Sequence, residues 1–255
     1  MLSPNELNEI IENLDIEFSD SCFEKELYEA LDRNCFGDVV FFSGGVDSTL
    51  LAYLANKKKK VICCTCGIPG AEDLIFAEKV CEKMNWLWQP IIVEDLKEYI
   101  KEVMRITHRK DPLGISLGLI TYLILSSRPE KVFISGLGAE DLFAGYSRFK
   151  KAKNYDELHK MLYDSLKELP KRDYEKDYLI ARELGKEIIY PFLSKEVLQI
   201  AMKIHPKYKL GDQNKLILRK IASKYIPDFS VYRIKRAAQF GSGFWKKVKK
   251  ILKEV

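Results

Sequence analysis

The segment Ser43-Gly-Gly-Val-Asp-Ser48 brings two glycines, two hydroxyls and a carboxylate together within six residues. It follows the β-rich run 38–42 and precedes the apolar segment 49–55, so it is expected to form the turn between a buried strand and a helix. Backbone N–H groups at a helix N-terminus attract anions, and glycines let the backbone approach a phosphate closely. Asp47 would repel that phosphate unless Mg²⁺ lay between them. The pattern predicts a magnesium-dependent phosphate site.

Two common phosphate-binding sequences are absent. The chain contains no G-x-x-x-x-G-K-[ST], and no G-x-G-x-x-G follows the first predicted strand. A Walker A loop and a dinucleotide-binding turn are therefore excluded at this position.

The elements that would hold this turn alternate between strand and helix. Strands are predicted at 38–42, 61–66, 88–93 and 131–135, and the helices between them at 49–55, 71–84, 95–107 and 116–126. Such alternation requires right-handed crossovers and gives a parallel sheet covered by helices on both faces. Two helical segments precede it at 5–13 and 23–33. Beyond residue 150 the chain is mainly helical, with segments near 155–167, 174–184, 194–203, 213–225 and 244–254.

Composition places the chain among globular proteins. Of the 255 residues, 47% are hydrophobic and 31% are charged, which excludes disordered and collagenous classes. Residues 1–150 carry 17 Lys and Arg against 24 Asp and Glu, whereas residues 151–255 carry 25 against 13. The second part is therefore basic and suited to polyanions. The N-terminus lacks the pattern of a signal peptide and no segment is long enough to span a bilayer, so we expect a cytoplasmic protein with reduced cysteines and no membrane partner.

Four motifs together resemble a known family. The segment 43–48 resembles the Ser-Gly-Gly-x-Asp-Ser signature of the ATP pyrophosphatase (PP-loop) superfamily. Gly136-Leu-Gly-Ala-Glu-Asp-Leu-Phe-Ala-Gly-Tyr146, Glu187-Ile-Ile-Tyr-Pro-Phe-Leu-Ser194 and the segment 233–243 are similar, in the same order, to later motifs of asparagine synthetases and β-lactam synthetases. The resemblance covers about residues 38–245. It implies a Rossmann-like, adenine nucleotide α-hydrolase-like fold with a five-stranded parallel sheet and a mainly helical C-terminal part.

The resemblance also implies a reaction. ATP would activate a carboxylate as an acyl-adenylate with release of pyrophosphate, and ammonia or an amine would then attack the acyl carbon. Asp47 and Glu140 would bind Mg²⁺, with Asp141 as the substitute if the second motif is shifted by one residue. Lys235 would stabilise the developing negative charge, and Glu187 would contact substrate or move a proton. The expected ATP-binding residues are Ser43, Gly44, Gly45, Asp47, Ser48, Gly67, Gly136 and Gly138.

The chain departs from the family at several points. Residues 1–37 read as a helical extension in place of a glutaminase domain, followed by the synthetase-like domain 38–255, with a nucleotide-binding core at 38–150 and a helical substrate part at 151–255. Nitrogen would therefore come from ammonia, an amine or a separate glutamine amidotransferase subunit. Leu137, Ile189 and Ser194 replace residues that are usually polar or charged in the family, so the substrate carboxylate is not identified. A homo-oligomer is compatible with the sequence.

Two other functions stay open. A tRNA-modifying PP-loop enzyme, with tRNA as the partner, would use the basic C-terminal part and the cluster Cys63, Cys64 and Cys66. On a strand Cys64 and Cys66 share one face while Cys63 points to the other, and buried structural thiols are the simpler interpretation. A non-catalytic nucleotide-binding subunit would explain the altered residues of the later motifs.

Overall fold

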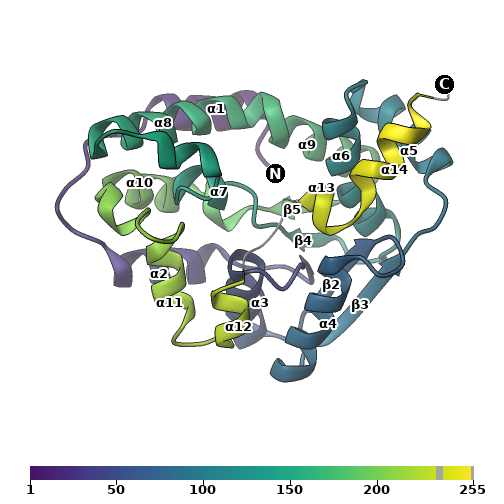
Figure 1. Ribbon diagram of the computed structural model, residues 1–255, viewed down its shortest axis with the longest axis horizontal. Coiled ribbons are helices and arrows are strands. Elements are labelled where there is room, and N and C mark those ends of the chain that lie inside the picture. Colours follow the sequence, from purple (N-terminus) through teal and green to yellow (C-terminus); the bar gives the residue numbers. More distant parts are fainter. Residues whose placement is uncertain (234–237, 254–255) are drawn as a thin grey trace.

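The computed structural model describes residues 1–233 and 238–253. Its centre is a five-stranded parallel sheet with the strand order β3-β2-β1-β4-β5 (Figure 1), so the predicted parallel α/β fold is confirmed. Four strands lie where the sequence predicts them, and the fifth comes from the third motif. The strands are β1 Val39–Phe41, β2 Ile62–Gly67, β3 Leu87–Ile92, β4 Val132–Ile134 and β5 Glu187–Ile189.

The strand order changes direction at the central strand β1. The chain adds β2 and β3 on one side of β1, and then β4 and β5 on the other side. Val40 of β1 pairs with Cys63 of β2 on one side and with Ile134 of β4 on the other. The loops that leave the carboxyl ends of β1 and β4 therefore diverge from a common point. In open parallel sheets such a switch point is where ligands bind.

Helices cover both faces of the sheet. Helices α3 (Val46–Lys58) and α4 (Glu72–Met84) pack on one face, and α6 (Pro112–Ser126) and α9 (Glu175–Glu183) pack on the other (Figure 1). Helix α5 (Lys97–Thr107) lies outside α6 and α9. Helix α6 carries no charged residue because it is enclosed by the sheet, α5, α9 and α14 (Phe244–Ile251).

The remaining helices flank this core. Helix α1 (Pro4–Glu12) begins with a capping box between Ser3 and Glu6. It packs on α8 (Tyr155–Leu169) and on the π-helical turn η2 (Pro170–Tyr174) that joins α8 to α9. The expected mainly helical C-terminal part is confirmed. The other helical elements are α1 Pro4–Glu12, α2 Glu24–Asn34, α7 Ala139–Leu142, η1 Ser147–Lys151, α8 Tyr155–Leu169, η2 Pro170–Tyr174, η3 Pro191–Leu193, α10 Lys195–Lys203, η4 Pro206–Tyr208, α11 Leu216–Ala222, α12 Asp228–Val231, α13 Ala238–Gly241 and α14 Phe244–Ile251.

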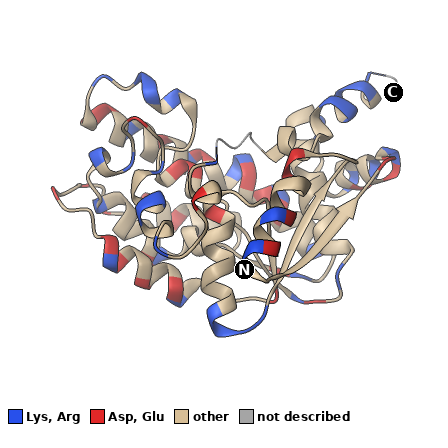
Figure 2. Ribbon diagram, turned by 60° about the horizontal axis from the view of Figure 1, so that its bottom comes forward, with Lys and Arg blue, Asp and Glu red and all other residues tan. Residues whose placement is uncertain are grey.

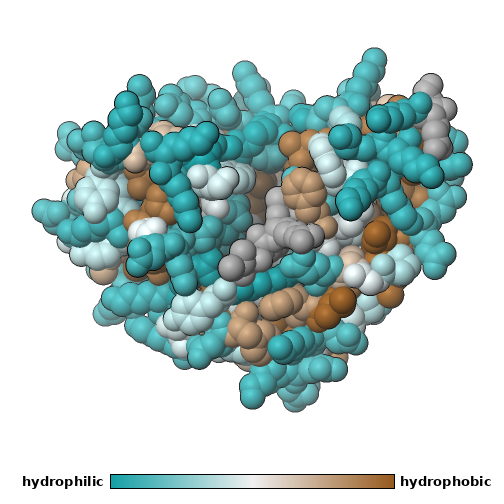
Figure 3. Space-filling view, in the orientation of Figure 1, coloured by the Kyte–Doolittle hydropathy of each residue, from teal (hydrophilic) through white to brown (hydrophobic). Residues whose placement is uncertain are grey.

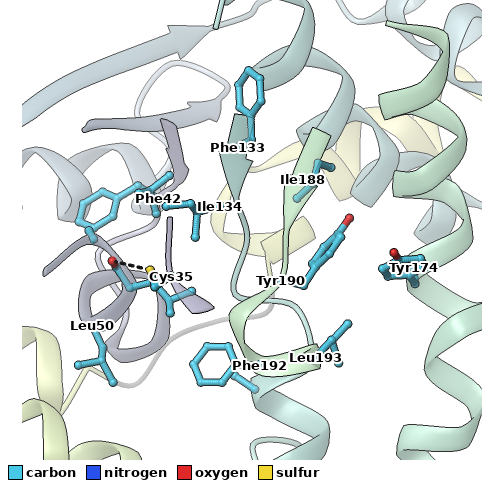
Figure 4. Packing of buried hydrophobic residues seen from close by; sticks show 14 of the residues in the cluster. Cys35, Phe42, Leu50, Phe133, Ile134, Tyr174, Ile188, Tyr190, Phe192 and Leu193 are labelled. Atoms are coloured by element: carbon cyan, nitrogen blue, oxygen red, sulfur yellow. Dashed lines mark hydrogen bonds between the residues drawn. The ribbon is translucent and has the colours of Figure 1, made fainter. Parts of the chain in front are cut away.

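One hydrophobic core joins the sheet to the C-terminal part. Phe133 and Ile134 of β4 lie beside Ile188 of β5, and Phe192 follows below them (Figure 4). The thiol of Cys35 donates to the carbonyl oxygen of Leu51, at 3.3 Å, so even this sulfur is used structurally. Residues on both sides of position 150 are thus packed in one cluster.

The surface is largely polar. Figure 3 shows one face that is mostly hydrophilic with small apolar areas, and Figure 2 shows Lys and Arg concentrated on α14 near the C-terminus. Among the described helices, none combines the length and the apolar character that crossing a bilayer requires.

Candidate active site

The glycine turn at residues 43–48 joins β1 to α3, as the sequence predicts. Gly44 has φ of +73°, and a Cβ added to it would lie 3.0 Å from the carbonyl oxygen of Phe76. Gly45 is the N-cap of α3 and provides no side-chain cap, so the first N–H groups of this helix have no capping side chain. Ser43 Oγ and Ser48 Oγ lie 3.3 Å apart within the same turn. The turn therefore presents hydroxyls and a helix N-terminus to one place, as an anion site requires.

Side chains from the far end of the chain hold this turn in place. Ser230 Oγ lies 2.8 Å from the carbonyl oxygen of Gly44 and 2.9 Å from Thr49 Oγ1. The Arg233 guanidinium donates to the carbonyl oxygen of Ser43 and, at 2.9 Å, to Asp73 Oδ1. Because the Arg233 side chain is 2% exposed, it acts as a buried clamp. The carbonyl oxygens of Ser43 and Gly44 are thus bonded to side chains from the C-terminal part of the chain.

The second motif lies directly beside the first. Gly136 follows β4, and a Cβ on it would lie 3.6 Å from Cβ of Asp47. Gly138 has φ of +96° and begins α7, and a Cβ there would lie 2.5 Å from Leu193. Glycine is favoured at position 138 because other residues rarely adopt this backbone conformation and a side chain there would displace Leu193. The two glycine loops therefore form the walls of one site at the switch point of the sheet.

Two carboxylates from these loops meet at one buried lysine. Lys215 Nζ lies 2.6 Å from Oδ2 of Asp47 and 2.7 Å from Oε1 of Glu140. The Lys215 side chain is 5% exposed. Burial disfavours its charge, but the two carboxylates outweigh burial and raise the pKa of Lys215 above its ordinary value. A permanent cation therefore stands between the two residues that the sequence predicts as Mg²⁺ ligands.

The backbone around Lys215 fixes its position. Lys215 has φ of +57°, and its N–H donates to the carbonyl oxygen of Phe143 at 3.0 Å. Arg219 donates to both the backbone and the side-chain oxygen of Asn214, whose amide donates to the carbonyl oxygen of Gly145. A Cβ on Gly145 would overlap Glu140 Oε2 and lie 2.6 Å from Cε of Lys215. The close approach of Glu140 and Lys215 therefore depends on glycine at position 145.

Asp141, the alternative metal ligand, is bonded elsewhere. Its Oδ1 accepts hydrogen bonds from Ser165 Oγ at 2.5 Å and from the guanidinium of Arg172 at 2.9 Å. The side chain is 1% exposed, and burial raises its pKa even though Arg172 and Ser165 act in the opposite direction. Asp141 thus ties α7 to α8 and η2, and Glu140 is the residue of this pair that faces Asp47.

Three further predicted residues have different outcomes. Gly67 ends β2, and a Cβ on it would lie 3.1 Å from the carbonyl oxygen of Ser242, so it packs against the end of the late motif. Glu187 is the first residue of β5 and accepts from the N-terminal ammonium of Met1 at 3.0 Å. It lies at the amino end of its strand, so the structure does not bring it to the glycine loops at the carboxyl ends. Lys235 lies outside the described residues.

The residues that depart from the family pattern have structural roles. Ser194 is the N-cap of α10, and its Oγ accepts from the N–H of Val197. Ile189 ends β5 and pairs with Ile134. Leu137 is half-buried in the second glycine loop. None of the three supplies charge to the site.

The cysteine cluster on β2 is buried. Cys63, Cys64 and Cys66 are at most 4% exposed. The free thiol of Cys63 interacts with that of Cys81 on α4, whereas Cys66 Sγ lies 3.8 Å from the carbonyl oxygen of Ile120 on the opposite face. Burial raises the pKa of Cys64 to about 12 and of Cys66 well above its ordinary value. These thiols are therefore structural and remain protonated at neutral pH.

Sequence reasoning missed Lys215, Ser230 and the role of Arg233. Lys215 is 168 residues from Asp47 along the chain, and the sequence predicts only that it belongs to the helix at 213–225. Arg233 opens the late motif, but the clamp on Ser43 depends on a contact over 190 residues. Nothing local marks either residue, because lysine and arginine are common throughout this basic part of the chain.

The geometry fits a divalent cation. Asp47 Oδ1 is buried and accepts no hydrogen bond from the part of the chain that the structure describes, so one carboxylate oxygen has unused lone pairs. Carboxylate oxygens are the ligands that Mg²⁺ prefers, together with water and phosphate oxygens. Asp47 and Glu140 would hold such an ion beside the anion site.

A protein-family model described as asparagine synthase matches residues 23–155 and 150–255. A putative glutamine-hydrolyzing asparagine synthetase of Methanocaldococcus jannaschii is 32% identical over 256 residues, which cover 84% of this chain and 47% of that protein. Asparagine synthetase B of Escherichia coli is 28% identical over 228 residues, which cover 80% and 41%. The chain thus spans less than half the length of these two relatives.

Two solved structures are similar at lower levels. The U34-tRNA thiolase NcsA of Methanococcus maripaludis, with its [4Fe-4S] cluster, has a TM-score of 0.35 and 14% identity, covering 92% of this chain and 80% of that one. The NMN synthetase of Francisella tularensis has a TM-score of 0.33 and 14% identity, covering 100% and 98%.

Proposed function

This chain belongs to the asparagine synthase family, and we propose that it is an ATP-dependent ligase that forms AMP and pyrophosphate. The proposed reaction joins a carboxylate to ammonia or an amine through an acyl-adenylate. One observation carries the proposal: Asp47 and Glu140, from two glycine loops at the switch point of the sheet, converge on one cation beside the N-terminus of α3.

Different residues of the chain would have different roles in this reaction. The N–H groups of the turn at 43–48 and the hydroxyls of Ser43 and Ser48 would bind the β- and γ-phosphates, which leave together as pyrophosphate. Arg233 and Ser230 would keep the turn's carbonyls away from that charge. Because attack on the α-phosphorus needs no protein nucleophile, positioning and charge stabilisation account for catalysis.

Asp47 and Glu140 would hold the magnesium ion that ATP brings. When bound, Mg²⁺ supplies positive charge to the phosphates. Lys235, in the late motif, is proposed to add a second cation on the pyrophosphate side.

The acyl and nitrogen substrates are proposed only by class. Ile189 and Ser194 give the third motif no charge of its own, so a carboxylate other than aspartate fits this chain as well as aspartate does. Nitrogen would come from ammonia, an amine on the substrate or a separate glutamine amidotransferase subunit. A tRNA-thiolating activity has less support, because the buried thiols of β2 are unsuited to carry sulfur.

The products of ATP turnover test the proposal. Purified protein would be given α-labelled ATP, Mg²⁺ and pools of small carboxylates with ammonia, and separately a cell extract. We expect labelled AMP and exchange of labelled pyrophosphate into ATP that depends on one carboxylate. Formation of ADP and phosphate instead would show that the adenylation reaction is wrong.

A matched pair of aspartate variants controls for nonspecific damage. Asp47→Ala removes a carboxylate at the carboxyl end of β1 and should lower pyrophosphate exchange at least 100-fold, a loss that corresponds to about 2.7 kcal/mol. Asp38→Ala removes one that precedes β1 at its other end, where it pairs with Lys59 at the surface. The Asp38 variant should retain the exchange rate of the wild type.

A further inference from the structure

We propose that Lys215 is an internal counter-ion that occupies the metal position of the nucleotide-free protein, so that the divalent cation enters only together with nucleotide. The inference rests on the proposed function for the identity of the nucleotide. Its physical content is narrower, since it concerns which cation neutralises Asp47 and Glu140 before ATP arrives.

The first step is that Lys215 and a metal ion bound by the same two carboxylate oxygens exclude each other. Mg²⁺ binds carboxylate oxygens at about 2.0–2.1 Å, whereas Lys215 Nζ lies 2.6 Å from Asp47 Oδ2 and 2.7 Å from Glu140 Oε1. An ion shared by these two oxygens would therefore occupy nearly the same space as the ammonium group. Two cations at such a separation in a buried site would repel each other strongly.

The second step is that the surrounding structure holds Lys215 in place beside the two carboxylates. Its backbone is held in the left-handed region by the hydrogen bond to Phe143 and by the Asn214–Arg219 pair. With only 5% of the side chain exposed, solvent offers it few alternative partners. A free divalent ion would have to displace a paired, buried cation.

The third step explains why nucleotide would change this balance. A triphosphate at the turn 43–48 brings several negative charges next to Asp47, so the site would then need more positive charge than one lysine supplies. The phosphate oxygens also give the Lys215 ammonium new acceptors, so the lysine leaves the carboxylates without becoming an unpaired buried charge. Metal and nucleotide would therefore bind as a unit, and each would bind weakly alone.

Binding of Mn²⁺ without nucleotide tests this directly. Free Mn²⁺ would be followed by electron paramagnetic resonance as protein is titrated. Wild type should show no specific site below millimolar Mn²⁺, whereas Lys215→Met and Lys215→Gln should bind one ion at least tenfold more tightly. Lys176→Met is the matched control, because Lys176 is also 5% exposed and paired with a carboxylate, Asp177, but with only one. That control should gain no site.

The outcomes separate this inference from the proposed function. Specific Mn²⁺ binding by nucleotide-free wild type would overturn the counter-ion role, even if both Lys215 variants failed to fold. Folded Lys215 variants that gain no metal site would overturn it as well. If the variants gain the site but no form of the protein binds ATP, the counter-ion role stands and the proposed function fails.

Discussion

The buried amine of Lys209 should lower the stability of the folded protein by an amount that follows from its pKa. Its side chain is 0% exposed, and Nζ has no hydrogen-bond partner among the described residues. Burial lowers its pKa from 10.5 to about 7. The difference of about 3.5 units corresponds to a cost of about 5 kcal/mol at pH values below 7, at about 1.36 kcal/mol per unit.

The sign of the pH dependence follows from proton binding. Between pH 7 and pH 10.5 the unfolded chain keeps the Lys209 proton that the folded chain has lost, so the contribution of Lys209 to stability rises with pH. The cost is fully present below pH 7, falls to about 2 kcal/mol at pH 9 and to about 1 kcal/mol at pH 10. Lys209→Met removes the cost at every pH, because methionine is apolar and of similar length.

Urea unfolding of wild type and Lys209→Met at pH 6, 7, 8, 9 and 10 measures this effect. The variant should be more stable by several kcal/mol at pH 6, and the gap should shrink steadily up to pH 10. Comparing the two proteins at each pH cancels the titration of the other groups. A gap that does not change with pH, or a wild type that is the more stable at pH 6, would refute the reasoning.

Two further predictions concern the glycine loops. Glu140→Gln should weaken Mg²⁺-dependent ATP binding at least tenfold in calorimetry and cost little stability because Asp47 still pairs with Lys215, whereas Asp141→Ala should lower stability by about 3–5 kcal/mol because it removes the buried acceptor of Ser165 and Arg172; equal stability losses in the two variants would contradict the assignment. Gly44→Ala should weaken ATP binding and cost more stability than Gly70→Ala, since both have φ of +73° but only Gly44 lacks room for a Cβ. Equal losses in both properties would show that the space around Gly44 is unimportant.

Local sequence was sufficient for the sheet and for the first glycine turn. The alternation of apolar strands with helices predicts four strands, and Gly44 and Gly45 between β1 and α3 mark the turn. The sequence alone does not single out strand β5, Glu187–Ile189, because a proline follows closely at position 191 and a proline within an apolar run argues against a strand.

Other site residues are harder to predict, because their roles depend on the direction of a side chain or on contacts between segments that are far apart in the sequence. Adjacent residues on a helix point about 100° apart, so the sequence Glu140-Asp141 cannot tell which carboxylate faces Asp47. Glu187 belongs to the right motif, but as the first residue of a parallel strand it lies at the edge opposite the loops. Lys215 reaches the site only through tertiary folding, and no local sequence pattern predicts its contact with Asp47.

The most direct test is a crystal structure with Mg²⁺ and an ATP analogue that cannot be cleaved between its α- and β-phosphates. The account predicts the triphosphate against residues 43–48, the metal bound by Asp47 and Glu140, and Lys215 Nζ moved away from both carboxylates. Phosphates bound elsewhere, or a metal bound while Lys215 still bridges Asp47 and Glu140, would contradict it.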